Sequence, residues 1–152
     1  MKEQEIYFIT QTLDKIQVNS LIADVDVFVS LHRAEGFGLV MAEAMLLGTV
    51  CVATDWSSNT EFMDKESACM VSYRKVEIQK TSGNYKKGCV WAQADVEEAA
   101  GYLRRLYEDR AYYEQLVVRA KIKIEECLGK DRIVELLESR MAEINGLLCD
   151  GE

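Results

Sequence analysis

The sequence predicts an α/β fold, a Rossmann-like three-layer sandwich with a mainly parallel sheet. Short apolar segments at 6–9, 25–31, 49–54 and 68–73 have the length of buried strands. Helical segments separate the first three of them, and strands that alternate with helices pair in parallel through right-handed crossovers. Ligands of such sheets bind beyond the carboxyl ends of the strands, so functional residues are expected in the loops that follow them.

The N-terminal part of the chain predicts a strand followed by a helix. Residues 6–9 (IYFI) form an apolar run that is typical of a buried strand. Asp14 and Gln17 have the spacing of a capping box, in which each side chain bonds the backbone N–H of the other residue. A helix is therefore expected to begin here, with apolar side chains at Ile16, Leu21 and Ile22.

A second strand and a second helix follow, joined by a loop that contains glycine. The β-branched segment 25–31 predicts the strand, and the helix is expected to begin near Phe37 or Gly38. This helix is apolar on nearly every side, which predicts that it is buried. Gly48 is expected to end it, because glycine readily adopts the left-handed conformation at a helix C-terminus, and the next buried strand is expected at 49–54.

The second half of the chain predicts loops, one short strand and three helices. Segment 55–64 is expected to be a polar turn that includes one helical turn, before the strand at 68–73. Segment 74–87 is polar, with a loop marked by Ser82–Gly83–Asn84, and an apolar stretch follows at 89–92. Asp95 and Glu98 are expected to cap the first helix. The other two are expected to end near Gly129 and to run from about Asp131 to Asn145–Gly146.

Composition limits the class of protein and its partners. With 152 residues, nearly half of them hydrophobic, the chain predicts one globular domain. Its formal net charge of −8 argues against nucleic acid as a partner. Five cysteines without a C-x-x-C pair and a single histidine indicate mostly buried thiols, a cytoplasmic location and no metal site. The longest apolar runs are far shorter than a membrane span, so no transmembrane segment is expected.

The segment EGFGLVMAE, from Glu35 to Glu43, carries the candidate site. Glycines at 36 and 38 let the backbone come close to a bound group, and the unpaired N–H groups at the start of the following helix favour an anion such as phosphate. Glu43 lies less than two turns into the helix, so its carboxylate can reach back toward the helix start. Carboxylates accept hydrogen bonds from sugar hydroxyls, so the pattern points to a nucleotide-sugar.

The longer segment EGFGLVMAEAMLLGTVCVATDWSSNTEFM resembles the E-x7-E signature of the retaining family-4, group 1 glycosyltransferases, in the C-terminal half of their two-domain GT-B fold. The similarity extends upstream through ADVDVFVSLHR and downstream into a helical tail at about 95–148. It implies that residues 1–152 are part of a C-terminal domain that binds a nucleotide-sugar. The full-length parent would transfer the sugar, with retention, to a glycan or another acceptor, as in the synthesis of capsule-type polysaccharides.

The resemblance implies a role for each residue of the motif. Glu35 matches the first Glu, which lies near the transferred sugar, and is the expected catalytic residue. Glu43 matches the second, which holds the ribose hydroxyls. The alternative for Glu43, a buried carboxylate paired with a basic residue, is less favoured because the helix contains no Lys or Arg. Backbone N–H groups are expected to bind the sugar and the diphosphate at Gly36, Phe37, Gly38 and Leu39.

Other loops are expected to approach the same ligand. Arg33 follows a strand and either approaches a phosphate or is a solvated loop residue, and Thr10 lies where the family contacts the nucleotide base. His32 is not expected to act as a base, because it has no evident orienting partner. No metal or other cofactor is expected beside the nucleotide-sugar substrate. Further residues expected to line the crevice are Thr54, Asn59, Thr60 and Glu61.

The resembled enzymes are more than twice as long, and the comparison predicts what this chain lacks. Their N-terminal acceptor domain, and the Arg and Lys that neutralise the diphosphate, have no counterpart here, so the chain by itself is expected to be inactive or nearly so. A non-catalytic nucleotide- or sugar-binding module of the same fold is the alternative. The comparison also predicts that the first strand and helix of the C-terminal domain have no counterpart in this chain. Without that edge strand a sheet edge would be unpaired, which predicts some self-association.

The final helix allows two interpretations. Its apolar face, with Ile133, Leu136, Leu137, Met141 and Ile144, either packs on this domain or, around Ile144, Leu147 and Leu148, is a surface toward another domain, since the last helix of the resembled enzymes crosses to the N-terminal domain. Packing on this domain is the favoured interpretation.

Overall fold

The computed structural model describes the backbone of residues 6–149 and the side chains of residues 6–146. It confirms the α/β fold with a parallel sheet. Three parallel strands lie in the order β1 (Val27–Ser30), β2 (Val50–Thr54) and β3 (Cys69–Val71). The strands expected at 25–31, 49–54 and 68–73 are therefore present within shorter bounds.

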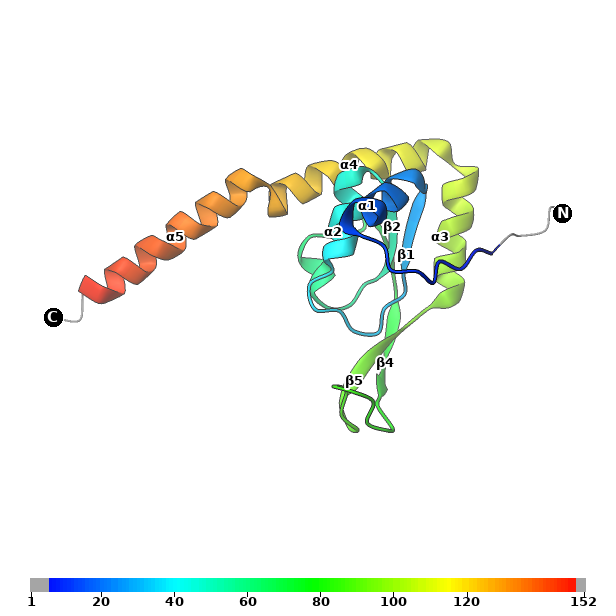
Figure 1. Ribbon diagram of the computed structural model, residues 1–152, viewed down its shortest axis with the longest axis horizontal. Helices are drawn as coiled ribbons and strands as arrows, with labels where there is room; N and C mark the ends of the chain where they lie inside the picture. Colours follow the sequence, from blue (N-terminus) through cyan, green and yellow to red (C-terminus); the bar gives the residue numbers. More distant parts are fainter. Residues whose placement is uncertain (1–5, 150–152) are drawn as a thin grey trace.

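Helices cover both faces of this sheet, which makes three layers (Figure 1). The helices α1 (Lys15–Asp24) and α2 (Leu39–Leu47) pack on one face, and α3 (Val96–Glu108) packs on the other. The long helix α4 (Arg110–Leu128) contributes Leu116 to the core on the α3 side and Ala120 and Ile124 to the core on the α2 side. It therefore joins the two cores.

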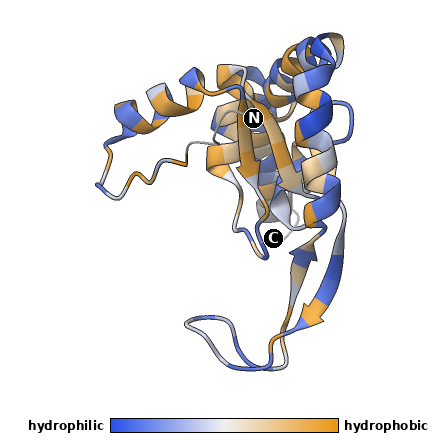
Figure 2. Ribbon diagram, turned by 90° about the vertical axis from the view of Figure 1, so that its right-hand side faces the viewer, coloured by the Kyte–Doolittle hydropathy of each residue, from blue (hydrophilic) through white to orange (hydrophobic). Residues whose placement is uncertain are grey.

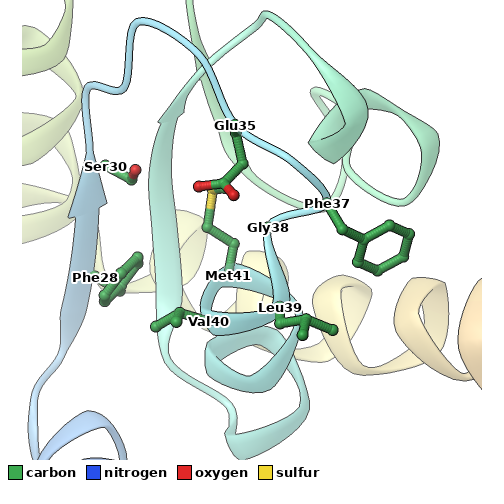
Figure 3. Close-up of a pocket in the computed structure, with 8 residues that line it drawn as sticks. All are labelled: Phe28, Ser30, Glu35, Phe37, Gly38, Leu39, Val40 and Met41. Carbon is green, nitrogen blue, oxygen red and sulfur yellow. The ribbon is translucent and has the colours of Figure 1, made fainter. Parts of the chain in front are cut away.

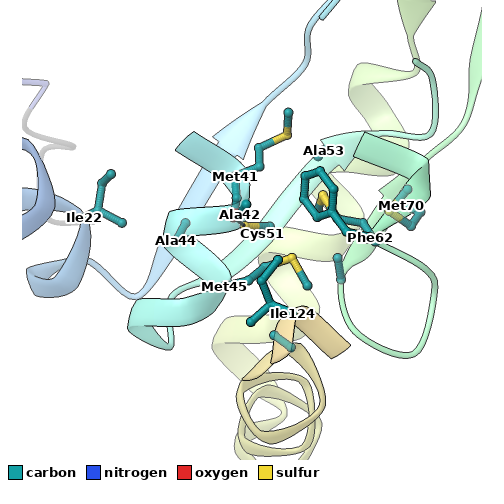
Figure 4. Close-up of a cluster of buried hydrophobic side chains, with 13 residues drawn as sticks. Ile22, Met41, Ala42, Ala44, Met45, Cys51, Ala53, Phe62, Met70 and Ile124 are labelled. Carbon is teal, nitrogen blue, oxygen red and sulfur yellow. Dashed lines mark hydrogen bonds between the residues drawn. The ribbon is translucent and has the colours of Figure 1, made fainter. Parts of the chain in front are cut away.

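Strand β2 is the centre of the sandwich, because its residues are buried on both faces. Cys51 and Ala53 face the core formed with α2, and Val50 and Val52 face the core formed with α3 (Figure 4). A central parallel strand covered by helices on both sides has no solvent face, which explains why its sequence shows no alternation of polar and apolar residues.

The predicted helix boundaries are set by specific caps. The capping box of Asp14 and Gln17 is present, with both hydrogen bonds formed. Gly48 ends α2 in the left-handed conformation (φ 90°), as expected. Asp95 caps α3 by accepting from the N–H groups of Glu97 and Glu98, but the Glu98 carboxylate accepts from the N–H of Ser72 instead of completing the box.

The polar segment 74–87 lies within a hairpin: its first four residues are in a strand, and the loop expected around Ser82–Gly83–Asn84 is present in residues 78–87. Strands β4 (Tyr73–Glu77) and β5 (Val90–Ala94) pair antiparallel and extend away from the sandwich (Figure 2). Polar and charged side chains are suited to strands that are exposed to solvent, so the composition of this segment resembles that of a loop. Only the cross-strand pairing identifies it as a hairpin. The helical turn expected within 55–64 is present at Ser58–Glu61.

The prediction of a strand at residues 6–9 is wrong. These residues form no strand of either described sheet, and their side chains are exposed, with Phe8 at 85%. Four apolar residues fit a strand, but a strand forms only where a neighbouring edge pairs with it. The burial expected for α2 is also only partly correct, because Leu39, Val40, Leu46 and Leu47 are exposed. A helix that is apolar all round carries no periodicity to show which side faces solvent.

The last helix does not pack on the sandwich, so the favoured interpretation of its apolar face is wrong. Helix α5 (Lys130–Cys149) runs away from the domain beyond α4 (Figure 1), and its apolar side chains from Ile133 to Ile144 are exposed. The helix also continues through Asn145–Gly146, where an end was expected. The side chains of Leu147 and Leu148 lie outside the described ones. Within residues 6–149, no helix is long and apolar enough to cross a membrane.

Adjacent residues of α2 provide a test of this packing. Met45 is fully buried in the core that contains Ile124, whereas the next residue, Leu46, is 52% exposed. We expect Met45→Ala to lower the free energy of unfolding by about 2–5 kcal/mol, because it removes buried apolar volume and leaves a cavity. Leu46→Ala is the matched control and should cost less than about 1 kcal/mol. Urea denaturation of both variants measures the difference, and equal losses would contradict the burial described for α2.

Candidate functional site

A pocket of about 360 Å³ lies where β1 ends and α2 begins (Figure 3). The Glu35 carboxylate projects into it over the Met41 side chain, and Ser30 adds a hydroxyl from the end of β1. The rest of the lining is apolar apart from the backbone of Gly38, and consists of Phe28, Phe37, Leu39, Val40 and Met41. The pocket lies at the carboxyl end of a parallel strand, which is the usual place for a ligand in such a sheet.

The turn into α2 depends on Gly38. This residue is the N-cap of the helix and has a left-handed backbone (φ 91°), which a residue with a Cβ adopts only at a cost. No described side chain caps the helix. The N–H groups of its first turn are consequently left for water or a bound anion.

Hydrogen bonds from the segment after β2 hold the loop that carries Glu35. Thr54 Oγ1 donates to the His32 carbonyl oxygen at 2.9 Å, and Ser57 Oγ donates to the Glu35 carbonyl oxygen at 2.7 Å. Ser58 Oγ donates to the carbonyl oxygen of Gly36. The His32 Nε2–H donates to the Trp56 carbonyl oxygen at 2.9 Å, so the histidine serves to join the two loops. Four contacts along five residues fix the path of the loop.

Two residues of that segment have unusual environments. Ser57 has φ 81° and ψ −162°, a conformation that is almost confined to glycine, and it is held there while its side chain bonds the Glu35 carbonyl. Asn59 is fully buried, and its Nδ2 donates to the Thr54 carbonyl oxygen at 3.1 Å. Its Oδ1 is buried without a hydrogen-bond partner among the described residues. Asn59 also lies beside Gly38, 3.5 Å from the position that a Cβ would take there.

Glu43 is half-buried and lies outside the lining of this pocket. Its Oε1 forms an ion pair with Lys15 at the first position of α1, so the paired carboxylate that the sequence disfavoured is what the structure contains. The prediction took account only of basic residues within the same helix, whereas the partner of Glu43 belongs to α1. The second oxygen, Oε2, is buried and lacks a hydrogen-bond partner among the residues described.

The structure brings together only some of the residues that the sequence selected. Four of the twelve named in the sequence analysis line the pocket, namely Glu35, Phe37, Gly38 and Leu39. Phe37 packs against Phe62 with ring centroids 5.4 Å apart, so part of its side chain belongs to the core. Gly36 is exposed in the loop, and its N–H donates to the neighbouring Glu35 carboxylate at 2.9 Å.

Two further residues that were expected to contact the ligand do not line the pocket. Thr10 is exposed in the irregular segment before α1. The Arg33 guanidinium lies over the Trp91 ring, 4.7 Å from its centroid, and therefore belongs to the contact with the hairpin. A cation stacked on an indole is attracted by the ring face, so this contact favours the observed orientation of the guanidinium.

The four residues expected after the second strand do not line the pocket, which corrects the expected role of Thr54, Asn59, Thr60 and Glu61. Thr54 and Asn59 form the hydrogen bonds described above, and Thr60 Oγ1 donates to the Ser57 carbonyl oxygen at 2.7 Å. The sequence analysis did not select Phe28, Val40 or Met41 as lining residues. Phe28 was detectable, because it lies two positions before Ser30 on the strand and so faces the same side.

The chemistry available at this site is that of hydrogen-bond donors and carboxylates. Within the described part of the chain, no three Cys, His, Asp or Glu side chains are grouped as metal ligands. The thiol nearest the helix, Cys51, is buried, and burial raises its pKa to about 12, so it stays protonated at neutral pH. A ligand with both an anionic group and hydroxyl groups matches the free amides of α2 and the carboxylate of Glu35.

The two loop glycines differ in a way that can be measured. Ala at position 38 would adopt a left-handed backbone and place its Cβ 2.8 Å from Met41 Cε, whereas Gly36 has open space around its Cα. We expect Gly38→Ala to lower the free energy of unfolding by about 1–3 kcal/mol, chiefly through the backbone conformation, because the Met41 methyl can move. Gly36→Ala should change it by no more than about 0.5 kcal/mol. Denaturant titration compares them, and an unaffected Gly38→Ala variant would contradict this geometry.

Comparison with known proteins places this fold and site in a family. The family model described as "Glycosyl transferases group 1" matches residues 2–109, a range that includes the parallel sheet, the pocket loop, the hairpin and α3. No curated protein matches the chain. The match covers more than two thirds of the sequence, and the observed parallel sheet with helices on both faces agrees with it. The chain therefore belongs to the group 1 glycosyltransferases.

Proposed function

We propose that this domain binds the nucleotide-sugar donor of a retaining glycosyltransferase. The observation that carries the proposal is the buried Glu43 Oε2, which has no hydrogen-bond partner within the described residues. A buried carboxylate oxygen without a partner is costly, and a ligand hydroxyl that donated to it would remove this cost. The spacing of Glu35 and Glu43 resembles the E-x7-E signature of the retaining family-4 enzymes, which supports retention and assigns the ribose hydroxyls to Glu43.

The parts of the donor match the parts of the site. The diphosphate would lie at the N–H groups of the first turn of α2, which no described side chain caps, with Gly36, Phe37, Gly38 and Leu39 supplying the backbone. The sugar would lie in the pocket beside Glu35, whose carboxylate accepts hydrogen bonds from hydroxyls. The carboxylate would then face the anomeric carbon, where positive charge develops during transfer. No metal or other cofactor is part of this proposal.

Arg33 and Thr10 have secondary roles in this proposal. Arg33 would turn from Trp91 toward the diphosphate once the donor is bound, which requires only a change of side-chain rotamer, since its guanidinium is exposed. Thr10 would approach the base from the segment before α1. Because Arg33 is the only Lys or Arg between residues 31 and 38, we propose that transfer needs further cations from an acceptor-binding domain. This chain alone would then bind the donor without transferring the sugar.

The resemblance also supports a cytoplasmic location and a glycan acceptor, such as a growing polysaccharide. A non-catalytic module that binds nucleotides or sugars is the second candidate, favoured by the ion pair between Glu43 and Lys15, which gives this carboxylate a structural partner. The two candidates differ in a measurable property. A donor-binding enzyme domain should support transfer when it is combined with an acceptor-binding domain of the family, and a non-catalytic module should not.

Donor binding can be measured directly. We expect one of UDP, GDP and ADP, or its sugar conjugate, to raise the thermal midpoint of the chain without added metal, with an affinity measurable by calorimetry. Glu43→Ala should weaken that affinity about tenfold or more, because the ribose loses its acceptor. Lys15→Ala is the matched control, since it breaks the same ion pair and keeps the carboxylate. It should retain binding.

The control separates the two roles of Glu43. If Lys15→Ala and Glu43→Ala weakened binding equally, the ion pair and not the carboxylate would be what the nucleotide requires. If no nucleotide stabilised the chain, the proposal of a donor-binding domain would be wrong, while the family and the fold would stand.

The edge of the parallel sheet predicts self-association. Among residues 6–149, β1 pairs only with β2, so its other edge presents backbone groups without a strand partner, and the exposed Val29 lies on this strand. Such an edge favours pairing with another copy. We expect the average mass in sedimentation to rise with concentration, and Val29→Lys to suppress the rise by placing a charge on the edge. A constant monomer mass at high concentration would contradict the prediction.

A further inference from the structure

The hairpin differs in charge from the rest of the molecule. Between Ser72 and Ala94 the chain has five basic residues and one acidic residue, whereas the remaining sequence has thirteen basic and twenty-five acidic residues. All five basic side chains are exposed: Arg74, Lys75, Lys80, Lys86 and Lys87. Among the described residues, none of the five forms an ion pair. A chain with a net charge of −8 thus concentrates unneutralised positive charge on one projecting element (Figures 1 and 2).

The hairpin is an ordered element with its own internal contacts. Beyond the paired strands, the Ile78 N–H donates to the Cys89 carbonyl oxygen at 2.8 Å, and Ser82 and Tyr85 exchange two backbone hydrogen bonds. The Tyr85 ring meets the edge of the Trp91 ring with centroids 5.9 Å apart, and Ile78 is buried. The basic side chains are therefore presented on a supported framework.

Its base contacts both loops that form the candidate site. On one side, the Trp56 ring packs against Tyr73 with centroids 5.0 Å apart, and Lys75 Nζ lies 5.2 Å from the Trp56 centroid. On the other side, Arg33 stacks on Trp91, and the Ala92 N–H donates to the Arg33 carbonyl oxygen at 2.9 Å. Trp56 precedes the serine that holds Glu35, and Arg33 precedes Glu35 by two residues. The basic hairpin therefore stands at the same end of the sheet as the pocket.

We infer that the β4–β5 hairpin binds anionic groups of the acceptor, and that the acceptor is an acidic oligosaccharide that carries carboxylates or phosphates. The inference rests on the proposed donor-binding function, because an acceptor must approach the donor sugar from this end of the sheet. Unpaired Lys and Arg side chains bind such anions through charge-assisted hydrogen bonds. The turn at Ser82, Gly83 and Asn84 adds a hydroxyl and an amide, which suit sugar hydroxyls.

A lipid surface fits the hairpin less well than a saccharide does. Elements that insert into a membrane surface present an apolar face with large side chains beside their basic residues. Here the turn is polar, Ile78 is buried, and the Trp91 ring is covered in part by Arg33 and Tyr85. These features favour a soluble, hydroxyl-rich anion as the partner.

The test compares two sets of charge reversals that change the net charge equally. The hairpin set is Lys80→Glu with Lys86→Glu and Lys87→Glu. The control set is Lys65→Glu with Lys121→Glu and Lys130→Glu, which are exposed lysines outside the hairpin. Both sets are first checked for an unchanged thermal midpoint, so that a folding defect is not mistaken for a binding defect.

The probes are an oligogalacturonate, a neutral malto-oligosaccharide of equal length, and vesicles of phosphatidylglycerol with phosphatidylcholine. We expect the full chain to bind the oligogalacturonate and not the neutral sugar, with an affinity that falls as salt is added. The hairpin set should weaken this binding about tenfold or more, and the control set less than about threefold.

Three outcomes would overturn the inference: equal loss in both sets, equal binding of the neutral sugar, or hairpin-dependent binding to the vesicles without binding to the oligogalacturonate. Nucleotide titration of the same variants keeps the two proposals apart. Loss of acidic-sugar binding with unchanged nucleotide binding is the expected result for the hairpin set. Absence of nucleotide binding in the unaltered chain would count against the donor proposal and not against the charge recognition measured here.

Discussion

The register between β1 and β2 is the constraint on which the candidate site depends. Ser30 pairs with Ala53, so the next residues of the two strands leave the sheet side by side. That register places the Thr54 hydroxyl at the His32 carbonyl and starts the series of hydrogen bonds that continues to Glu35 and Gly36. A shift by one residue would turn each side chain to the other face and break the whole series.

The same register connects the site with the core. Because β2 is buried on both faces, packing against α2 and α3 fixes its position. The segment that follows β2 therefore starts from a fixed point. Asn59 and Phe62 lie beside Gly38, so the turn into α2 is formed against buried side chains. The neighbouring packed residues stabilise the strained backbone conformation of Ser57. The Ser57 hydroxyl in turn holds the loop that carries Glu35 by donating to the Glu35 carbonyl oxygen.

The hairpin extends this arrangement beyond the sandwich. Trp56 belongs to the segment that holds the site loop, and it also packs on the hairpin through Tyr73 and Lys75. The candidate pocket, the supporting segment and the basic hairpin are thus connected by direct contacts. In the proposed function, such a connection would keep the two substrates of a transfer reaction at a fixed separation, which is the positional advantage that enzymes use.

The sequence by itself determined the features that depend on neighbours along the chain. These are the three parallel strands, the capping box at Asp14, the ends set by Gly48 and Asp95, and the glycine loop before an apolar helix. Each follows from the backbone preferences or hydrogen bonds of a few consecutive residues. The four expected site residues that line the pocket lie within five consecutive residues for the same reason.

The tertiary structure alone decided which residues from distant segments meet. Four features depend on where the elements lie in space. They are the ion pair of Lys15 with Glu43, the hydrogen bond from Ser57 to the Glu35 carbonyl, the exposure of residues 6–9, and the direction of α5 away from the sandwich. An apolar run has the same pattern whether it packs against a neighbour or not, and a charged side chain does not reveal its partner along the sequence. Local sequence therefore fixes the elements, and long-range packing selects their contacts.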